Sequence, residues 1–268
     1  MRLRLLSPPD APTTTIAHRG ASAHAPENTL AAVRTAIDLG CDLVEVDVHR
    51  TRDGHLVVMH DVGLTRTTDA TQALPGHAPW RVGDLTYGEL LRLDAGSWFS
   101  PAHVGERVPT LAQVIDLLAD SDTGLLLEVK EPGRYPGIAR DLAAELRERT
   151  GYVESAAAAG RLVVQSFNHD VMRTFAGLEP RIPIGLLGHP PQRRLPALAE
   201  WASFVNPRHR RATTAYVDAI HAEGMQCLVW TPDSVADIHR GLSLGVDGVI
   251  TNRPELLQRM LEDRLVTA

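Results

Sequence analysis

The feature that most constrains the fold of this chain is a repeated alternation of short apolar segments with amphipathic ones. The apolar segments are nearly continuous and rich in β-branched residues, which is typical of strands buried on both faces of a parallel sheet. Eight such segments occur, at Thr14–His18, Asp42–His49, Gly124–Lys130, Leu162–Phe167, Ile182–Leu187, Ser203–Asn206, Gln226–Trp230 and Gly248–Thr251. The segments between them have the apolar spacing of helices. They are Asn28–Leu39, Thr110–Ala119, Gly137–Arg149, His169–Ala176, Thr213–Glu223, Asp233–Leu244 and Pro254–Leu261, with a weaker candidate at Leu195–Trp201.

This order of elements predicts the architecture. Strands that alternate with helices eight times in 268 residues indicate a (β/α)8 TIM barrel, and an open doubly wound sheet is the alternative. The length suits one domain over residues 1–268. About 75 residues separate the second and third barrel strands, which is far more than one crossover needs. We expect residues 50–109, with a short strand at Leu56–His60 and a helix near Tyr87–Leu93, to form a small insertion at the active-site end of the barrel.

The composition restricts the partners and the location that we expect. A formal net charge of -6 argues against nucleic acid as the main partner. No apolar run approaches the roughly 18 residues that a membrane span needs, so we expect no stable membrane insertion. Residues 1–15 carry no recognisable secretion signal, and Cys41 and Cys227 suit buried thiols in a reducing compartment better than a disulfide bridge. These features favour a cytoplasmic protein and leave the oligomeric state open.

Charged side chains interrupt the second and third predicted strands. Residues two apart in a strand share a face, so Glu45 lies beside Asp47, and Glu128 beside Lys130. Because consecutive barrel strands are neighbours, we expect these groups to converge at the mouth of the barrel. Three buried carboxylates need a compensating cation, and an all-oxygen ligand set suits Mg²⁺ or Ca²⁺. Salt bridges to arginines, without a metal, are the alternative.

Two histidines at strand ends are candidate proton carriers. His18 ends the first predicted strand, and His60 ends the short strand of the insertion. The pKa of a histidine lies near neutrality, so a pair of them can serve as acid and base. His49 could also reach the site, or it could only cap the barrel, and we rank it below the other two.

Two cationic side chains accompany these groups. Arg19 follows His18, and its planar fork can bind phosphate oxygens with two hydrogen bonds or pair with Glu45 or Glu27. Lys130 is the single lysine among 27 lysine and arginine residues, and it supplies a compact charge beside the predicted cation site. A metal, an arginine and a lysine around one point indicate an anionic substrate, most simply a phosphate ester.

The motifs that carry these residues resemble those of the glycerophosphodiester phosphodiesterases. The matching segments follow one another through nearly the whole chain, as Ile16–Gly20, Pro26–Thr29, Glu45–Asp47, Val57–Asp61, Leu64–Thr68, Pro109–Leu111, Glu128–Lys130, Gln165–Phe167, Val229–Thr231 and Gly245–Thr251. The resemblance implies a barrel hydrolase that cleaves a small glycerophosphodiester to glycerol 3-phosphate and an alcohol. It also implies one divalent cation, and in the family a glycerol hydroxyl is thought to attack phosphorus, giving a cyclic phosphate that water opens.

The resemblance also assigns roles to residues of this chain. The metal ligands would be Glu45, Asp47 and Glu128, and the acid and base would be His18 and His60, in an order that the sequence does not decide. Arg19 and Lys130 would contact the phosphate, and Trp230 would line the substrate pocket, although it could equally be an aromatic plug of the barrel.

Two positions depart from the family's usual pattern. Asp233 stands after Trp230-Thr231-Pro232, where Asn is frequent, and Asn252 stands after Thr251, where Asp is common. We expect these departures to affect the shape of the pocket. Two other functions remain open: lysophospholipase D activity on lysophospholipids, which an apolar surface from Leu64, Trp80, Trp98 and Phe99 would favour, and non-catalytic binding of a phosphate ester.

Overall fold

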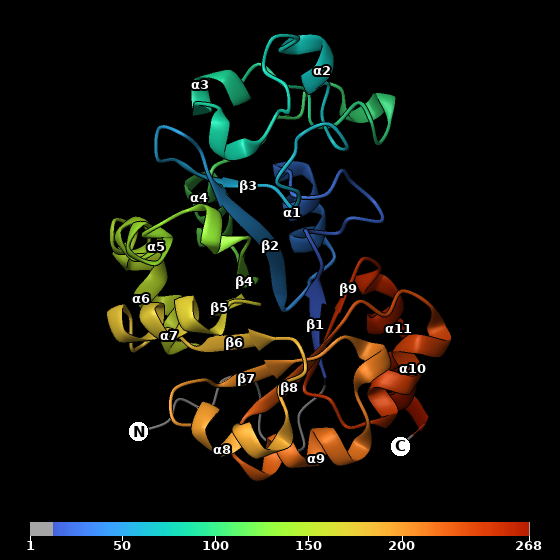
Figure 1. The fold of residues 1–268 in the computed structure, drawn as a ribbon. Helices are drawn as coiled ribbons and strands as arrows, with labels where there is room; N and C mark the ends of the chain where they lie inside the picture. The colour runs from blue at the N-terminus through green and yellow to red at the C-terminus, as the bar shows by residue number, and fades with distance from the viewer. Residues whose placement is uncertain (1–12, 268) are drawn as a thin grey trace.

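The structure is a computed structural model that describes residues 13–267, so most of the segment searched for a secretion signal lies outside it. Among these residues, eight parallel strands form a closed barrel (Figure 1). They are β1 (Thr14–Ala17), β2 (Leu43–Arg50), β4 (Gly124–Val129), β5 (Leu162–Ser166), β6 (Ile184–Leu187), β7 (Phe204–Asn206), β8 (Gln226–Trp230) and β9 (Gly248–Thr251). Strand β1 pairs with both β9 and β2, which closes the sheet. The predicted (β/α)8 barrel is therefore confirmed, and the open sheet is excluded.

Helices connect the strands and cover the outside of the barrel (Figure 1). They are α1 (Leu30–Asp38), α4 (Leu111–Ala119), α5 (Ile138–Arg147), α6 (Thr150–Ala158), α7 (His169–Leu178), α8 (Leu195–Leu198), α9 (Thr214–Ala222), α10 (Val235–Ser243) and α11 (Pro254–Thr267). Thr110 caps α4, where it accepts a hydrogen bond from the Gln113 backbone N–H in a capping box. The sequence predicted one helix where α5 and α6 lie. Helix α6 has little amphipathic periodicity because alanines fill its second half, so it gave no signal of its own.

The inside of the barrel has two layers. The lower layer is apolar and buried, and it consists of Ile16, Leu43, Leu126, Val163, Phe204, Leu228 and Ile250. Two residues further along β2 and β4 the inward side chain becomes polar: Glu45 follows Leu43, and Glu128 follows Leu126. The alternation of β2 therefore places its carboxylates above an apolar floor, at the carboxyl ends of the strands.

The insertion between β2 and β4 is a small unit with its own core. Strand β2 extends beyond the barrel and pairs antiparallel with β3 (Leu56–Val58), with Val48 opposite Val58. The short helices α2 (Ala70–Ala73) and α3 (Tyr87–Leu90) follow, beyond one end of the barrel in Figure 1. The buried core of the insertion is made by Val57, Met59, Leu64, Ala70, Leu74, Val82, Leu85, Leu90, Leu93, Ala95 and Val108.

The sequence did not decide whether Leu64, Trp80, Trp98 and Phe99 form an apolar surface or the core of the insertion, and the structure assigns them different positions. Leu64 is fully buried and Trp80 packs against the core, so both stabilise the insertion. Trp98 is 41% exposed, and its ring contacts Phe99 edge to face. Exposed apolar surface on the insertion is therefore offered by Trp98 and also by Leu91 and Val104, which are 45% and 65% exposed.

Two expectations drawn from composition can be compared with the structure. Cys41 and Cys227 are buried and unpaired, as predicted. None of the helices within residues 13–267 is long and apolar enough to cross a bilayer.

Candidate active site

Three buried carboxylates meet at the upper end of β2 and β4. The parallel register places Asp47 directly opposite Glu128, and Glu45 lies two residues before Asp47 on the same face. Each of the three carboxylates offers an oxygen atom within 4.8 Å of those of the other two. Their exposed fractions are 1% for Glu45, 1% for Asp47 and 7% for Glu128. The strand alternation and the adjacency of barrel strands predicted from the sequence thus bring the three acids together, in the register that the structure shows.

The electrostatics of this cluster differ from one carboxylate to the next. Burial and the charges of Asp47 and Glu128 raise the pKa of Glu45 well above its usual value. Burial and the charge of Asp47 raise the pKa of Glu128 to about 7. Burial alone would also raise the pKa of Asp47, but the charges of Lys130 and Arg19 hold it below its usual value. Lys130 and Arg19 therefore do not compensate the charge that the three carboxylates carry when all of them are ionised.

Lys130 and Arg19 are the cations nearest to the carboxylates. The Lys130 ammonium lies 2.8 Å from Glu128 Oε1 and 3.6 Å from Asp47 Oδ1. Arg19 Nε lies 3.4 Å from Asp47 Oδ2, and its Nη1 donates to Glu27 Oε1 at 2.9 Å. The predicted ion pair of Arg19 with Glu27 is confirmed, whereas Glu45 receives the backbone N–H of Arg19 at 2.9 Å.

The donor set of the cluster fits a hard divalent cation. All of its ligand atoms are carboxylate oxygens, which Mg²⁺ and Ca²⁺ prefer. Within residues 13–267, Asp47 Oδ1 is a buried oxygen without a hydrogen-bond donor. A buried acceptor of this kind is costly unless a cation or donor satisfies it. The salt bridges to Lys130 and Arg19 exist, but Lys130 reaches this oxygen only as an ion pair at 3.6 Å, and no cationic side chain within residues 13–267 forms an ion pair with Glu45.

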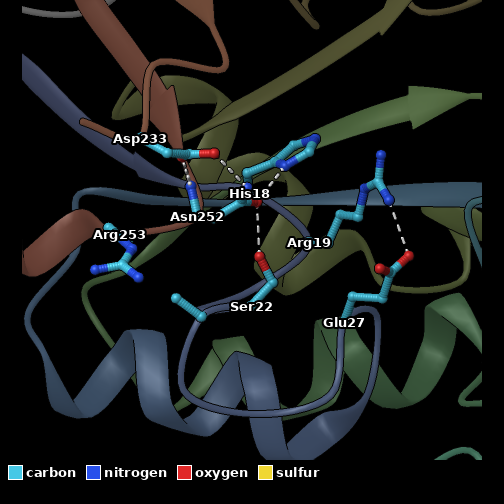
Figure 2. A pocket seen from close by; sticks show the side chains of 8 residues that line it. His18, Arg19, Ser22, Glu27, Asp233, Asn252 and Arg253 are labelled. Atoms are coloured by element: carbon cyan, nitrogen blue, oxygen red, sulfur yellow. Dashed lines mark hydrogen bonds and ion pairs between the residues drawn. The ribbon is translucent and has the colours of Figure 1, made fainter. Parts of the chain in front are cut away.

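His18 stands at the edge of a polar pocket beside this cluster. The pocket has a volume of about 340 Å³ and is lined by His18, Arg19, Ser22, Ala23, Glu27, Asp233, Asn252 and Arg253 (Figure 2). The Nδ1 atom of His18 lies 2.6 Å from Asn252 Oδ1. Burial and the neighbouring charge of Arg19 lower the pKa of His18 to about 4. His18 is therefore neutral at pH 7 and able to accept a proton.

His60 follows β3 and lies where the insertion meets the barrel. Its Nδ1 atom is 2.6 Å from Asp61 Oδ1, so the neighbouring carboxylate fixes the ring. Arg66 in turn contacts Asp61 and donates two hydrogen bonds to Glu27, at 2.9 and 2.7 Å. Because Glu27 also binds Arg19, these ion pairs connect the His60 side of the site with Arg19.

A tight turn after β1 places Arg19. Arg19 and Gly20 both have left-handed backbone angles, with φ of 56° and 78°. A Cβ atom on Gly20 would lie 2.5 Å from that of Ala32, so this position requires glycine. The turn directs the Arg19 N–H to Glu45. Non-glycine residues are held in this backbone region mostly at functional sites, where the surrounding structure compensates for the strain.

Two further candidates take positions that the sequence did not decide. Trp230 packs against the apolar floor, donates from Nε1 to the Asn206 carbonyl at 2.9 Å, and contacts Phe167 edge to face. It is thus partly a plug of the barrel, as one reading of the sequence allowed. His49 is fully buried, and its Nε2 donates to the His60 carbonyl at 3.0 Å, so it supports His60 from below.

Sequence reasoning missed several residues that orient the site. Asn28 donates to Asp47 Oδ2 at 2.9 Å and accepts from the Asp47 backbone N–H at 3.2 Å. Asp61 fixes His60, and Asn252 contacts His18. Asp61 could have been found because it follows His60 directly, and Asn28 because it lies within a matching motif. Asn252 had the signal of a departure from the family pattern, which we had assigned only to the shape of the pocket.

The chain is similar to known proteins over most of its length. The sequence profile of the glycerophosphoryl diester phosphodiesterase family matches residues 18–256. A glycerophosphodiester phosphodiesterase from Caldanaerobacter subterraneus subsp. tengcongensis is 37% identical over 249 residues, which cover 91% of this chain and 96% of the relative. Another, from Bacillus subtilis, is 33% identical over 260 residues, which cover 92% of this chain and 85% of the relative.

Solved structures give the same result for the fold. The crystal structure of a glycerophosphodiester phosphodiesterase from Agrobacterium tumefaciens aligns with a TM-score of 0.73 and 28% identity, covering 91% of this chain and 98% of the other. An Oleispira antarctica phosphodiesterase, solved in complex with the product sn-glycerol-3-phosphate, aligns with a TM-score of 0.79 and 29% identity, covering 94% and 97%. By its sequence and its structure, this chain belongs to the glycerophosphoryl diester phosphodiesterase family.

Proposed function

We propose that this protein hydrolyses small glycerophosphodiesters to glycerol 3-phosphate and an alcohol, with the help of one divalent cation. The observation that carries the proposal is the cluster of Glu45, Asp47 and Glu128, whose oxygens lie within 4.8 Å of one another beside two cationic side chains. The product bound in the Oleispira antarctica relative supports the same chemistry.

The carboxylates and the cationic side chains of the site would have different roles in binding. Glu45, Asp47 and Glu128 would hold the cation, which when bound neutralises the charge of the phosphate oxygens. Arg19 and Lys130 are anchored to these carboxylates and to Glu27, so their unpaired N–H groups can donate to the phosphate. Fixed donors of this kind need no reorganisation as charge develops.

The two histidines would move the protons. Cleavage of the diester requires a base for the attacking hydroxyl group and an acid for the leaving alcohol oxygen. Burial lowers the pKa of His18 to about 4, so its ring is neutral at pH 7 and has a lone pair that can accept a proton, as the base requires. His60, fixed by Asp61, suits the acid. Attack by the hydroxyl group would release the alcohol and leave a cyclic phosphate, which water then opens. In that second step His60 would take a proton from the water and His18 would return its proton to the glycerol oxygen, which restores both histidines.

The lining of the pocket favours a small polar substrate over a lysophospholipid. Of the eight side chains around the 340 Å³ cavity, Ala23 alone is apolar. An acyl chain gains free energy only where apolar surface covers it, at roughly 25 cal/mol per Å². Exposed apolar side chains favour a lipid, so both substrates belong in the test; they are Leu91, Trp98 and Val104 on the insertion and Phe167 after β5.

A substrate panel tests the proposal directly. We expect purified protein to release glycerol 3-phosphate from glycerophosphocholine with Mg²⁺ or Ca²⁺, and to lose the activity after exhaustive EDTA treatment. Asp47→Asn should abolish the activity, while Asp218→Asn, on the exposed side of α9, should leave it unchanged. Full activity after EDTA treatment contradicts the cation, and faster cleavage of lysophosphatidylcholine shows the lipid-directed activity instead.

A further inference from the structure

A chain of hydrogen bonds leads from His18 to a carboxylate on the far side of the pocket. His18 Nδ1 lies 2.6 Å from Asn252 Oδ1, which also accepts from Ser22 Oγ at 2.8 Å. Asn252 Nδ2 donates to Asp233 Oδ2 at 2.7 Å (Figure 2). Asp233 and Asn252 come from the segments that follow β8 and β9. These residues link His18 to the last two strands of the barrel.

The carboxylate at the end of this chain determines how the amide is oriented. An ionised carboxylate can only accept hydrogen bonds, so Asn252 must turn its NH₂ group toward Asp233. Asp233 is itself held by its other oxygen, Oδ1, which accepts from Thr251 Oγ1 at 3.0 Å and from the Asn252 backbone N–H at 2.9 Å. The Oδ1 atom of Asn252 consequently faces His18 and can only accept hydrogen bonds, as it does from Ser22 Oγ.

The orientation of the amide in turn determines the position of the ring hydrogen. Because Asn252 Oδ1 accepts, His18 Nδ1 must carry the hydrogen, and Nε2 must carry the lone pair. We propose that Asp233 and Asn252 are positioning residues that hold His18 in the Nδ1–H tautomer, so that Nε2 can accept the proton of the attacking hydroxyl group. This inference rests on the proposed function, in which His18 is the base.

The two residues of this pair are also the two departures from the family pattern. The chain has Asp at 233, where Asn is frequent, and Asn at 252, where Asp is common. The structure joins them by two hydrogen bonds, one of them between the two side chains, so each departure compensates the other. With Asp at 233 and Asn at 252, one amide and one carboxylate remain in contact. The group that faces His18 is then the neutral amide oxygen of Asn252. The sequence alone does not show that Asp233 and Asn252 are in contact.

Removal of the charge at position 233 should reverse the direction of the hydrogen bond between Asn252 and His18. In Asp233→Asn, two NH₂ groups could face each other, and the change that avoids this is a flip of the Asn252 amide. The flipped amide donates to His18 Nδ1, so the ring hydrogen moves to Nε2, where it blocks proton acceptance. We expect ¹⁵N NMR of histidine-labelled protein to show His18 as the Nδ1–H tautomer in the wild type and as the Nε2–H tautomer in Asp233→Asn. The His18→Gln spectrum identifies the resonances.

Kinetics and two further variants complete the test. Asp233→Asn should lower kcat by about 10- to 100-fold, part of the usual contribution of a general base, with KM changed less than about twofold. The double variant Asp233→Asn/Asn252→Asp restores an amide–carboxylate contact and should recover both the Nδ1–H tautomer and most of kcat. Ser22→Ala removes one donor to Asn252 Oδ1 but leaves Asp233 in place, so it should keep the Nδ1–H tautomer.

The outcomes separate this inference from the proposed function. An Nε2–H tautomer in the wild type, or an Nδ1–H tautomer retained in Asp233→Asn, overturns the positioning role. If Asp233→Asn does not fold, as judged by circular dichroism, the double variant decides, because an Nε2–H tautomer there overturns the role as well. The NMR measurement needs no substrate, so absent hydrolysis by the wild type contradicts the proposed function without changing the tautomer result.

Discussion

The Nε2 atom of the buried His49 donates a hydrogen bond to the carbonyl oxygen of His60 at 3.0 Å, while its Nδ1 lies 2.8 Å from the hydroxyl group of Tyr135. Because a carbonyl only accepts, His49 carries its hydrogen on Nε2, and the Tyr135 hydroxyl donates to Nδ1. Burial lowers the pKa of His49, which keeps the ring neutral as this arrangement requires. A histidine of the barrel thus holds the backbone of a histidine of the insertion.

Substitution of His49 should therefore impair both stability and catalysis. His49→Ala leaves the buried His60 carbonyl without its donor, so we expect unfolding to become easier by about 1–3 kcal/mol. We also expect kcat to fall by about tenfold, because His60 is displaced. Tyr135→Phe is the matched control: it removes the other hydrogen bond of His49 and should change kcat much less. Equal losses of kcat in the two variants would contradict the positioning of His60.

The two proposed proton carriers give a direct prediction for catalysis. His18→Ala or His60→Ala should lower kcat by about 10²–10⁴, the usual contribution of general acid–base catalysis. Their thermal unfolding should stay close to that of the wild type, because both side chains are partly exposed. Steady-state release of glycerol 3-phosphate measures the effect. A nearly normal rate for either variant would remove that histidine from the reaction.

The single lysine should not be replaceable by arginine. Lys130 is largely buried between Glu128 and Asp47, where a broad guanidinium group has less room than an ammonium group. We expect Lys130→Arg to lower kcat/KM by about tenfold or more, and Lys130→Met by more still. Arg173→Lys, on the exposed face of α7, makes the reverse exchange as a control and should have no effect. Normal kcat/KM in Lys130→Arg would show that only the charge matters.

Cation binding should stabilise the folded protein measurably. Repulsion among Glu45, Asp47 and Glu128 destabilises the free site, and bound Mg²⁺ or Ca²⁺ relieves it. At 100 times its dissociation constant, a cation that binds only the native state adds about 2.7 kcal/mol. We expect a rise in Tm of roughly 5–10 °C by differential scanning fluorimetry. Asp47→Asn should lose this rise and Asp218→Asn should keep it; a rise of the same size in both would place the cation elsewhere.

Acid should weaken the insertion through Asp94. Hydrogen bonds from the backbone N–H groups of Gly96, Ser97 and Gly105 lower the pKa of Asp94 to about 2 against the opposing effect of burial. Since this folded-state pKa lies below the unfolded value of about 3.9, the stabilisation is complete above about pH 4 and disappears as the pH falls toward 2.

The corresponding measurement compares variants by urea unfolding at several pH values. Asp94→Asn should be less stable than the wild type by about 1 kcal/mol at pH 6, and the difference should shrink between pH 4 and 2. Asp122→Asn, at an exposed position, should show no such difference. A difference that stays constant down to pH 2 would mean that the Asp94 charge is not involved.

The parts of the site that could be predicted are those encoded within single strands. Alternation placed Glu45 beside Asp47, and the adjacency of consecutive barrel strands placed Glu128 next to them, as the register confirms. The contact between His18 and Asn252 joins residues 234 positions apart, and it exists only because β1 and β9 close the barrel. A local pattern does not contain such a contact. Helix α6 was missed for another reason, since its alanines present no apolar stripe.

The apolar floor of the barrel has a consequence for turnover. Ile16, Leu43, Leu126 and their neighbours fill the interior below the carboxylates and leave no route through the bottom of the barrel in the part of the chain that the structure describes. Because this packed layer closes the barrel below the carboxylates, products leave through the same end of the barrel at which substrate arrives. Products should therefore compete with substrate for occupancy, and the rate at which the phosphate-bearing fragment departs can limit the speed of the cycle.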